Sequence, residues 1–488
     1  MHLLKSSDDL RNKLISVLLF LVVSAMVAGV AQYVAQGFRA ISIPFPTSRP
    51  EAFVLDGIMR LAAGDALYRL LADAPMTVHV YNVFAYVAPA VVASPFSNNA
   101  ETLLVAGRCI GFASSIALAL LLGLYAFRIS SSYLVALFTA LLPFFFYEIA
   151  LTQFFRLRPE SPALLFSAAA IIYLLRSGER TPSLLCVAGL CFISFMFKQS
   201  FIAAPVAIGL YFLIARRWRC LGVFSAAYGS AVVALFLVMY GLSGYAYMEN
   251  AFVAMASNDV RVLEAIKIYS SYFFEKSFGL LLALPVALAV SIKHIRSHAL
   301  IACYFVTALV WNVYSSGKLG SSSNYYAEFG IASIIVIASM FRDHHEDGGR
   351  LPKLLVLIPV ALQVMFSAGS GFAASSPVIT RGDQGVDLAP YISRYQINEN
   401  KLILHEKIAV HLGDPAGYDW FLLDILIKQG RFDAGPFFQR IRAGEFKTIV
   451  FSKEPYSKFE RDLYRVVLMS PYQKTYEDQT VLEFGRIP

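Results

Sequence analysis

The sequence predicts an α-helical polytopic membrane protein that ends in a small extracytoplasmic α/β domain. Hydrophobic residues make up 57% of the 488-residue chain and charged residues only 15%, whereas soluble domains carry about 25% charged residues. About eleven apolar stretches between residues 14 and 367 have the composition of membrane-spanning helices. From about residue 368 onward the chain is much more polar.

Each apolar stretch is a candidate membrane-spanning helix. Residues 14–33 are interpreted as an anchor and not as a signal peptide, because the run is long and no clean cleavage site follows it. Several stretches are shorter than the roughly 17 residues of a full crossing, so some are expected to line a polar cavity. The candidate spans are residues 14–33, 103–127, 133–151, 162–175, 184–197, 201–215, 221–240, 278–292, 299–314, 329–340 and 354–367.

The connections on one side of these spans are short and basic, which is typical of cytoplasmic loops. This pattern predicts a cytoplasmic N-terminus, and an odd number of spans then puts the C-terminal tail outside. The basic connections are residues 5–13, Arg128, residues 176–180, 216–219, 293–296 and 342–353.

Three long segments fall on the opposite, outer side. Residues 35–101 form the first outer loop, and residues 244–276 include an amphipathic pattern at 260–269 that predicts an interfacial helix. We therefore divide the chain into a transmembrane domain, residues 1–367, and an outer domain, residues 368–488. In the outer domain, strand-like runs at 401–405, 448–452 and 480–484 alternate with helical patterns at 419–429 and 455–469.

Charge and cysteine content exclude several classes of partner. The net charge of +8 mostly reports lysine and arginine next to the membrane, so no nucleic-acid partner is expected. The five cysteines fall in or beside apolar spans and are interpreted as packing residues. His344 and His345 lie in a predicted cytoplasmic turn and are interpreted as a solvated turn. No metal site is assigned, and a requirement for a divalent cation is left open.

Four basic residues stand at tight outer turns, against the charge bias: Arg156, Arg158, Lys198 and Lys318. Single residues of this kind are often interfacial anchors whose charged heads extend to the membrane surface. Four such residues at separate turns that are expected to converge on one crevice favour a shared binding site over four separate anchors. Several cationic donors around one point are what a phosphate group requires.

The first outer loop offers two carboxylates. Pro50 and Glu51 open a predicted helix, since proline fixes the first turn and an acid suits the N-terminal dipole. Glu51 is therefore either a helix-start residue or a general base, and Asp56 on the same helix is the competing base.

The spacing of this loop resembles that of GT-C glycosyltransferases. Glu51 precedes the element Gly64-x-x-Leu67-Tyr68, and Pro75 and Tyr81 follow. The resemblance is to the bacterial relatives of protein mannosyltransferases and of aminoarabinose and galacturonic acid transferases.

Later motifs follow the order of the same family and extend the resemblance over nearly the whole chain. Residues 158–160 resemble "R-P-[DE]", residues 198–199 resemble "K-Q", and residues 320–328 resemble "G-x-x-x-H-Y-[FY]". Two departures are notable. Pro50 stands where an additional aspartate is common, and Asn324 stands where histidine is common.

The resemblance implies a GT-C-type membrane enzyme that takes a sugar from a polyprenyl-phosphate carrier. An inverting displacement would pass the sugar to a periplasmic lipid, glycan or protein acceptor at the bacterial inner membrane. Glu51 or Asp56 would act as the base, and Tyr325 and Tyr326 would stack on the sugar or the prenyl chain. The residues expected to bind substrate are Tyr68, Tyr81, Arg156, Arg158, Glu160, Lys198, Gln199, Lys318, Asn324, Tyr325, Tyr326 and Glu328.

Two other functions remain alternatives. A secondary transporter or lipid flippase predicts charges near mid-span and matched halves, and only Arg108 lies well inside an apolar stretch. A non-catalytic scaffold would use its tail to bind a partner.

Overall fold

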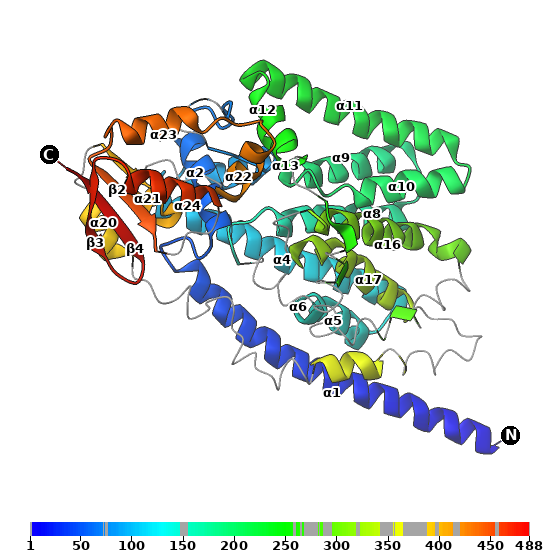
Figure 1. The fold of residues 1–488 in the computed structure, drawn as a ribbon. Helices are drawn as coiled ribbons and strands as arrows, with labels where there is room; N and C mark the ends of the chain where they lie inside the picture. The colour runs from blue at the N-terminus through cyan, green and yellow to red at the C-terminus, as the bar shows by residue number, and fades with distance from the viewer. Residues whose placement is uncertain are drawn as a thin grey trace.

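The computed structural model describes residues 2–71, 73, 77–146, 155–256, 260–263, 266–267, 282, 284–285, 295–318, 323–341, 355, 357–364, 388–395, 400–412, 420–453 and 458–487. Up to residue 341 the described residues form helices, and a small mixed sheet follows (Figure 1). The helices of the first part are α1 (His2–Ile41), α2 (Arg49–Ala62), α3 (Phe84–Ala93), α4 (Ala100–Ser130), α5 (Tyr133–Leu141), α6 (Pro143–Phe146), α8 (Glu160–Ser177), α9 (Thr181–Phe197), α10 (Ala203–Ile214), α11 (Trp218–Ser243), α12 (Ala246–Met248), η1 (Glu249–Val253), α13 (Ala254–Ala256), α16 (Ile295–Ser316), η2 (Ser323–Tyr326) and α17 (Ala327–Ser339).

Among the described residues, four helical segments are long and apolar enough to cross a membrane: Ile15–Ile41, Ala100–Ser130, Trp218–Ser243 and Ala299–Ser316. Shorter apolar helices lie between them, as the short candidate spans in the sequence indicated. The prediction of a helical membrane protein with a small α/β tail is confirmed, while the count of about eleven spans stays a prediction. Of the candidate spans, 278–292 lies mostly, and 354–367 partly, outside the described residues, as does part of the predicted interfacial helix 260–269.

One predicted span is interrupted. Residues 133–151 were expected to form a single helix, but α5 ends at Leu141 and Pro143 begins the short helix α6. Proline has no backbone N–H and its ring clashes with the preceding turn, so it favours the start of a helix over its interior.

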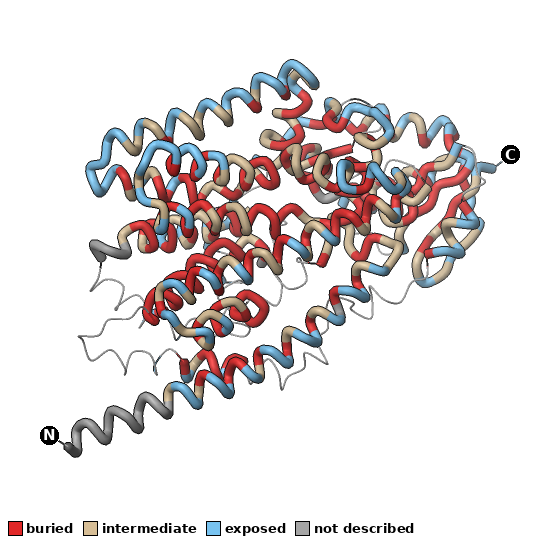
Figure 2. Tube along the Cα trace, turned by 180° about the vertical axis from the view of Figure 1, so that it is seen from behind, coloured by how far each residue is buried: buried red, intermediate tan, exposed pale blue. Residues whose placement is uncertain are grey.

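Two glycines allow the turn before α8 to lie against α1 and α4. A Cβ atom on Gly37 would lie 1.9 Å from the ring of Phe155, and one on Gly107 would lie 2.0 Å from Leu157 Cδ1. A side chain at either glycine would clash with this packing. The two glycines therefore let the segment just before Arg158 lie directly on α1 and α4. Helices α1 and α11 run along the outside of the bundle and are largely exposed (Figure 2).

The tail forms a four-stranded sheet in the order β1-β2-β4-β3. β1 pairs parallel with β2, and the other two pairings are antiparallel. The predicted strands and both predicted helices are present, whereas β3, α20, α21 and α23 were not expected. The elements are α20 (Ala389–Tyr395), β1 (Lys401–Ile403), α21 (Glu406–His411), α22 (Trp420–Lys428), α23 (Gly435–Arg442), β2 (Thr448–Ser452), α24 (Lys458–Leu468), β3 (Tyr472–Glu477) and β4 (Val481–Arg486).

The tail packs against the first outer loop and shares its core. One buried cluster joins Leu55 of α2 to Ile408 of α21, and Arg49 forms an ion pair with Glu460 of α24 at 3.2 Å. In Figure 1 the tail lies beside α2, at the end of the molecule opposite the N-terminus of α1. The domain boundary near residue 368 stays a prediction.

Candidate active site

A cavity of about 540 Å³ lies where α2, the turn before α8, the end of α9, α16 and α22 meet. Its walls are mostly apolar and aromatic, including Phe53, Phe252, Trp311 and Leu422. A concave apolar site with a few convergent polar groups is the usual form of a ligand-binding site. Seven of the residues predicted to bind substrate line it: Tyr81, Arg158, Lys198, Gln199, Lys318, Asn324 and Tyr325.

Three of the four outer bases therefore converge, and two of them share one carboxylate. Glu160 Oε1 accepts a hydrogen bond from Lys198 Nζ at 2.8 Å and from Asn324 Nδ2 at 2.6 Å. Arg158 Nη1 lies 4.0 Å from the same oxygen and donates to the Tyr81 hydroxyl at 3.1 Å. Burial of Glu160 raises its pKa, but the charges of Lys198 and Arg158 and these hydrogen bonds lower it to about 2.

Lys318 differs from Arg158 and Lys198 in having no ion pair with any carboxylate of the described part of the chain. Its segment is fixed by a bridge to Val260 and by a hydrogen bond from the Arg261 amide to the Gly317 carbonyl at 2.7 Å. Among the described residues, no carboxylate pairs with its ammonium group. Burial lowers the pKa of Lys318, because desolvation disfavours the charged form. An anionic ligand would restore the missing counter-charge.

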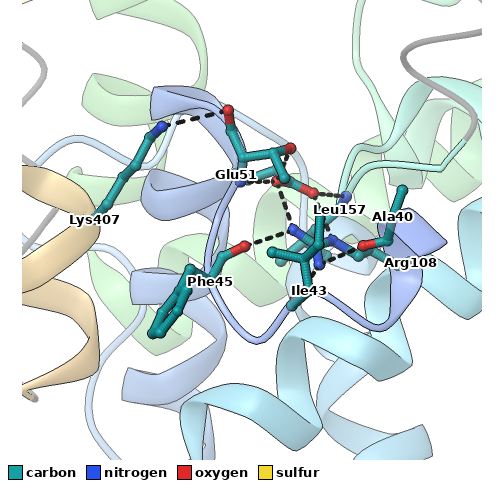
Figure 3. Close-up of polar contacts among 8 residues, drawn as sticks. Ala40, Ile43, Phe45, Glu51, Arg108, Leu157 and Lys407 are labelled. Carbon is teal, nitrogen blue, oxygen red and sulfur yellow. Dashed lines mark hydrogen bonds and ion pairs between the residues drawn. The ribbon is translucent and has the colours of Figure 1, made fainter. Parts of the chain in front are cut away.

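Beside the cavity, Arg108 of α4 is fully buried and all five of its N–H groups are used (Figure 3). Nη1 donates to the carbonyls of Ala40 and Ile43 and Nη2 to that of Phe45, at 2.6 to 2.8 Å. Nε and Nη2 both donate to the Glu51 carboxylate at 3.0 Å. Arg108 is the residue whose charge lies well inside an apolar stretch, as a transporter would require. In the structure it binds the end of α1 and the segment that leads to α2.

Glu51 completes this arrangement, which we call the Glu51–Arg108 hub. Besides the two bonds from Arg108, its carboxylate accepts bonds from the Thr47 amide and hydroxyl and from the Leu157 amide, at 2.6 to 2.8 Å. Burial raises the pKa of Glu51, but the charge and hydrogen bonds of Arg108, the bond from Leu157 and the charge of Arg156 lower it to about 2. A carboxylate with so low a pKa is a weak base, and Glu51 does not line the cavity.

Asp56, the alternative base, lies further along α2. Its Oδ2 accepts a hydrogen bond from Arg60 Nε at 2.9 Å and lies 3.4 Å from His79 Nε2. Burial lowers the pKa of His79 to about 4, against the opposing charge of Asp56, so this imidazole is neutral at pH 7. Asp56 also does not line the cavity, but Val78 and Val80, on either side of His79, do.

Besides Glu160, four predicted substrate-binding residues lie outside the cavity. The Tyr68 hydroxyl donates to the Tyr81 carbonyl at 2.8 Å and supports the cavity wall. The Tyr326 hydroxyl bonds Ser316, and the Glu328 carboxylate accepts from Ser167 and Tyr304 within the bundle. Arg156 acts on Glu51 through its charge. These four residues interact with other parts of the protein, and a role of any of them in binding substrate stays a prediction.

The sequence did not identify several contributors to the site. Leu422 reaches the cavity from the tail, and His79 lies behind its wall. Leu157 acts through its backbone amide, for which no side-chain pattern exists, and Thr47 through its amide and its hydroxyl. Within the described residues, no group of three or more His, Cys, Asp or Glu side chains is arranged to hold a metal ion.

Comparison with known proteins gives structural matches only. No protein-family model and no curated protein sequence matches this chain. A crystal structure of ArnT from Cupriavidus metallidurans bound to undecaprenyl phosphate matches with a TM-score of 0.61 and 12% identity, over 94% of this chain and 97% of that one. The apo structure of the same protein matches over the same shares with a TM-score of 0.60 and 12% identity. The chain therefore has the fold of the ArnT structures, as the GT-C resemblance of its motifs predicted.

Proposed function

We propose that this protein is a glycosyltransferase that moves a sugar from a polyprenyl-phosphate donor to an acceptor at the outer face of the membrane. The observation that carries the proposal is the convergence of Arg158, Lys198 and Lys318 on one apolar-walled cavity. Cations supply the donors that a phosphate needs, and the apolar walls suit a prenyl chain. The fold supports the proposal, because it is shared with a protein crystallised with undecaprenyl phosphate.

In the proposed reaction an acceptor hydroxyl attacks the anomeric carbon of the donor sugar from the face opposite the phosphate, and the general base takes the proton of that hydroxyl. The bond from this carbon to the phosphate oxygen breaks, and polyprenyl phosphate leaves with one more negative charge. Arg158, Lys198 and Lys318 stabilise that developing charge, which is the larger part of catalysis in many enzymes. Tyr81 and Tyr325 form the aromatic wall beside it.

The proposal is tested first at Lys318, because its removal leaves no carboxylate unpaired. Lys318→Ala is expected to weaken binding of polyprenyl phosphate and to lower transfer about tenfold, the loss of one charge-assisted contact. The exposed Lys447 of the tail gives a matched control, Lys447→Ala, with binding unchanged. Equal binding by both variants would remove Lys318 from the phosphate site.

Neither Glu51 nor Asp56 lines the cavity, and we propose Asp56 as the general base because the Glu51 carboxylate accepts five hydrogen bonds within the hub and its pKa is lowered to about 2. Asp56→Asn is expected to lower turnover about a hundredfold, the usual scale for a lost general base. Donor binding should change little, since the asparagine keeps the size of the side chain. Kinetics that separate turnover from donor affinity check this, and full turnover in Asp56→Asn would exclude Asp56.

The sidedness of the membrane is a separate prediction. Short basic loops are cytoplasmic, so the tail carrying α22 and α24 should lie outside. A reporter that is active only in the cytoplasm, fused after Pro488, is expected to be silent. Strong reporter activity would reverse the orientation and place the cavity away from an outer-leaflet donor.

A further inference from the structure

We infer that the donor sugar is an uncharged, hydroxyl-bearing sugar, and that the cavity discriminates against sugars that carry an amine. This inference rests on the proposed function and specifies its substrate class. Three features of the cavity lead to it: its charge, the occupation of its aromatic faces, and the orientation of one amide.

The charged groups that line the cavity have one sign. Arg158, Lys198 and Lys318 line it, and no carboxylate does among the described residues. Glu160, behind the cavity wall, spends Oε1 on Lys198 and Asn324, and its Oε2 is buried without a hydrogen-bond partner. The single charge of this carboxylate is already balanced by Lys198 at 2.8 Å. An ammonium group on the sugar would therefore enter a site with an excess of positive charge, and such like-charge contacts reject wrong partners strongly.

Aromatic rings are the other means of binding an ammonium group, and Lys198 lies over two of those that line the cavity. Its Nζ lies 4.9 Å from the ring centroid of Tyr325 and 5.7 Å from that of Tyr81. A second cation over these two rings would lie beside Lys198 and be repelled by it. The remaining aromatic wall, Phe53, Phe252 and Trp311, offers apolar faces on which an uncharged sugar ring can stack.

Gln199, which lines the cavity, holds a buried acceptor without a partner. Its Nε2 donates to the carbonyls of Val80 and Ala251, each at 2.6 Å. These two bonds use both amide hydrogens and fix the orientation of the side chain. The remaining atom, Oε1, is buried and has no hydrogen-bond partner, in a residue that lines the cavity. A buried acceptor without a partner is costly, and a sugar hydroxyl would satisfy it.

Charge balance favours a neutral sugar over an acidic one. Three cations and the paired Glu160 carboxylate leave a net charge of about +2 around the cavity. The donor phosphodiester carries about −1, and the leaving phosphate approaches −2 as the bond breaks. With a neutral sugar the site best matches the transition state, which is the condition for catalysis. A carboxylate on the sugar would neutralise part of the positive charge of the cavity in the ground state, so that less of it would remain to stabilise the leaving phosphate.

The test measures binding of farnesyl-phosphoryl sugars to the purified full-length protein in detergent. The set contains a neutral hexose, a hexuronic acid and an amino sugar, with farnesyl phosphate as the sugar-free reference. The neutral donor is expected to bind at least about tenfold more tightly than the amino sugar. It is also expected to release farnesyl phosphate faster than the uronic acid in a turnover assay, because a sugar carboxylate neutralises the cations before the phosphate leaves. In Lys318→Glu, which reverses one charge, the discrimination against the amino sugar is expected to fall at least about tenfold.

The outcomes separate the two proposals. Equal or tighter binding of the amino sugar, or equal or faster turnover of the uronic acid, with farnesyl phosphate bound, overturns the sugar class and leaves the transferase. Failure of farnesyl phosphate and of every donor to bind overturns both. Because the wild-type series needs no variant, it decides the question even if Lys318→Glu does not fold.

Discussion

Alanine at Arg158 or Lys198 is expected to lower sugar transfer about a hundredfold or more, the scale for losing a group that stabilises a developing oxyanion. Both residues line the cavity and both face the Glu160 carboxylate. The readout is transfer by purified protein at saturating donor, with expression and membrane insertion checked in parallel.

Removing Lys198 also leaves Glu160 with one partner fewer, so a loss of activity has two explanations. Lys198→Ala combined with Glu160→Gln removes the stranded charge and should restore stability without restoring transfer. Lys198→Arg, which keeps the charge, should retain part of the activity. Near-normal transfer in both Arg158→Ala and Lys198→Ala would mean that these bases are interfacial anchors.

The second large effect is expected at the Glu51–Arg108 hub. Glu51→Gln keeps the size of the side chain but leaves the Arg108 guanidinium, which is 0% exposed, without its counter-charge. Breaking one side of a buried ion pair costs about 3–5 kcal/mol, so the thermal unfolding temperature should fall markedly. The combined change Glu51→Gln and Arg108→Gln removes the unpaired charge and should recover part of that loss.

This variant also distinguishes the two roles of Glu51. A positioning residue should lose stability together with activity, because the Leu157 amide that it holds directly precedes Arg158. A general base should lose turnover alone. An unchanged unfolding temperature with turnover lowered about a hundredfold would return the role of base to Glu51.

The sequence predicted best those features of the fold and the site that depend on the chemical type of individual side chains. Apolar runs marked the helices, because a bilayer sets their length. Bases at the turns predicted to be outer marked the cavity, because lysine and arginine are unusual on the outer side of a membrane. Arg158, Lys198 and Lys318 come from three separate turns, and the structure brings them together.

The sequence was less informative where the backbone or distant packing determines the outcome. Glu51 has the sequence context of a catalytic acid, and its five bonds depend on Thr47, Arg108 and Leu157, which only the fold brings together. Leu422 reaches the cavity because the tail packs on α2. β3 was missed because its exposed, polar residues, Gln473 to Thr475, show little apolar alternation.

The central claim is that this protein transfers a sugar from a polyprenyl-phosphate carrier. Its most direct test is mass spectrometry of lipids and envelope glycans from a strain that lacks the protein. The account predicts that one acceptor loses the mass of a single sugar while the polyprenyl-phosphate-linked sugar accumulates. Wild-type protein should reverse both changes, and the Arg158→Ala variant should reverse neither. An unchanged acceptor profile without accumulated donor would contradict the account.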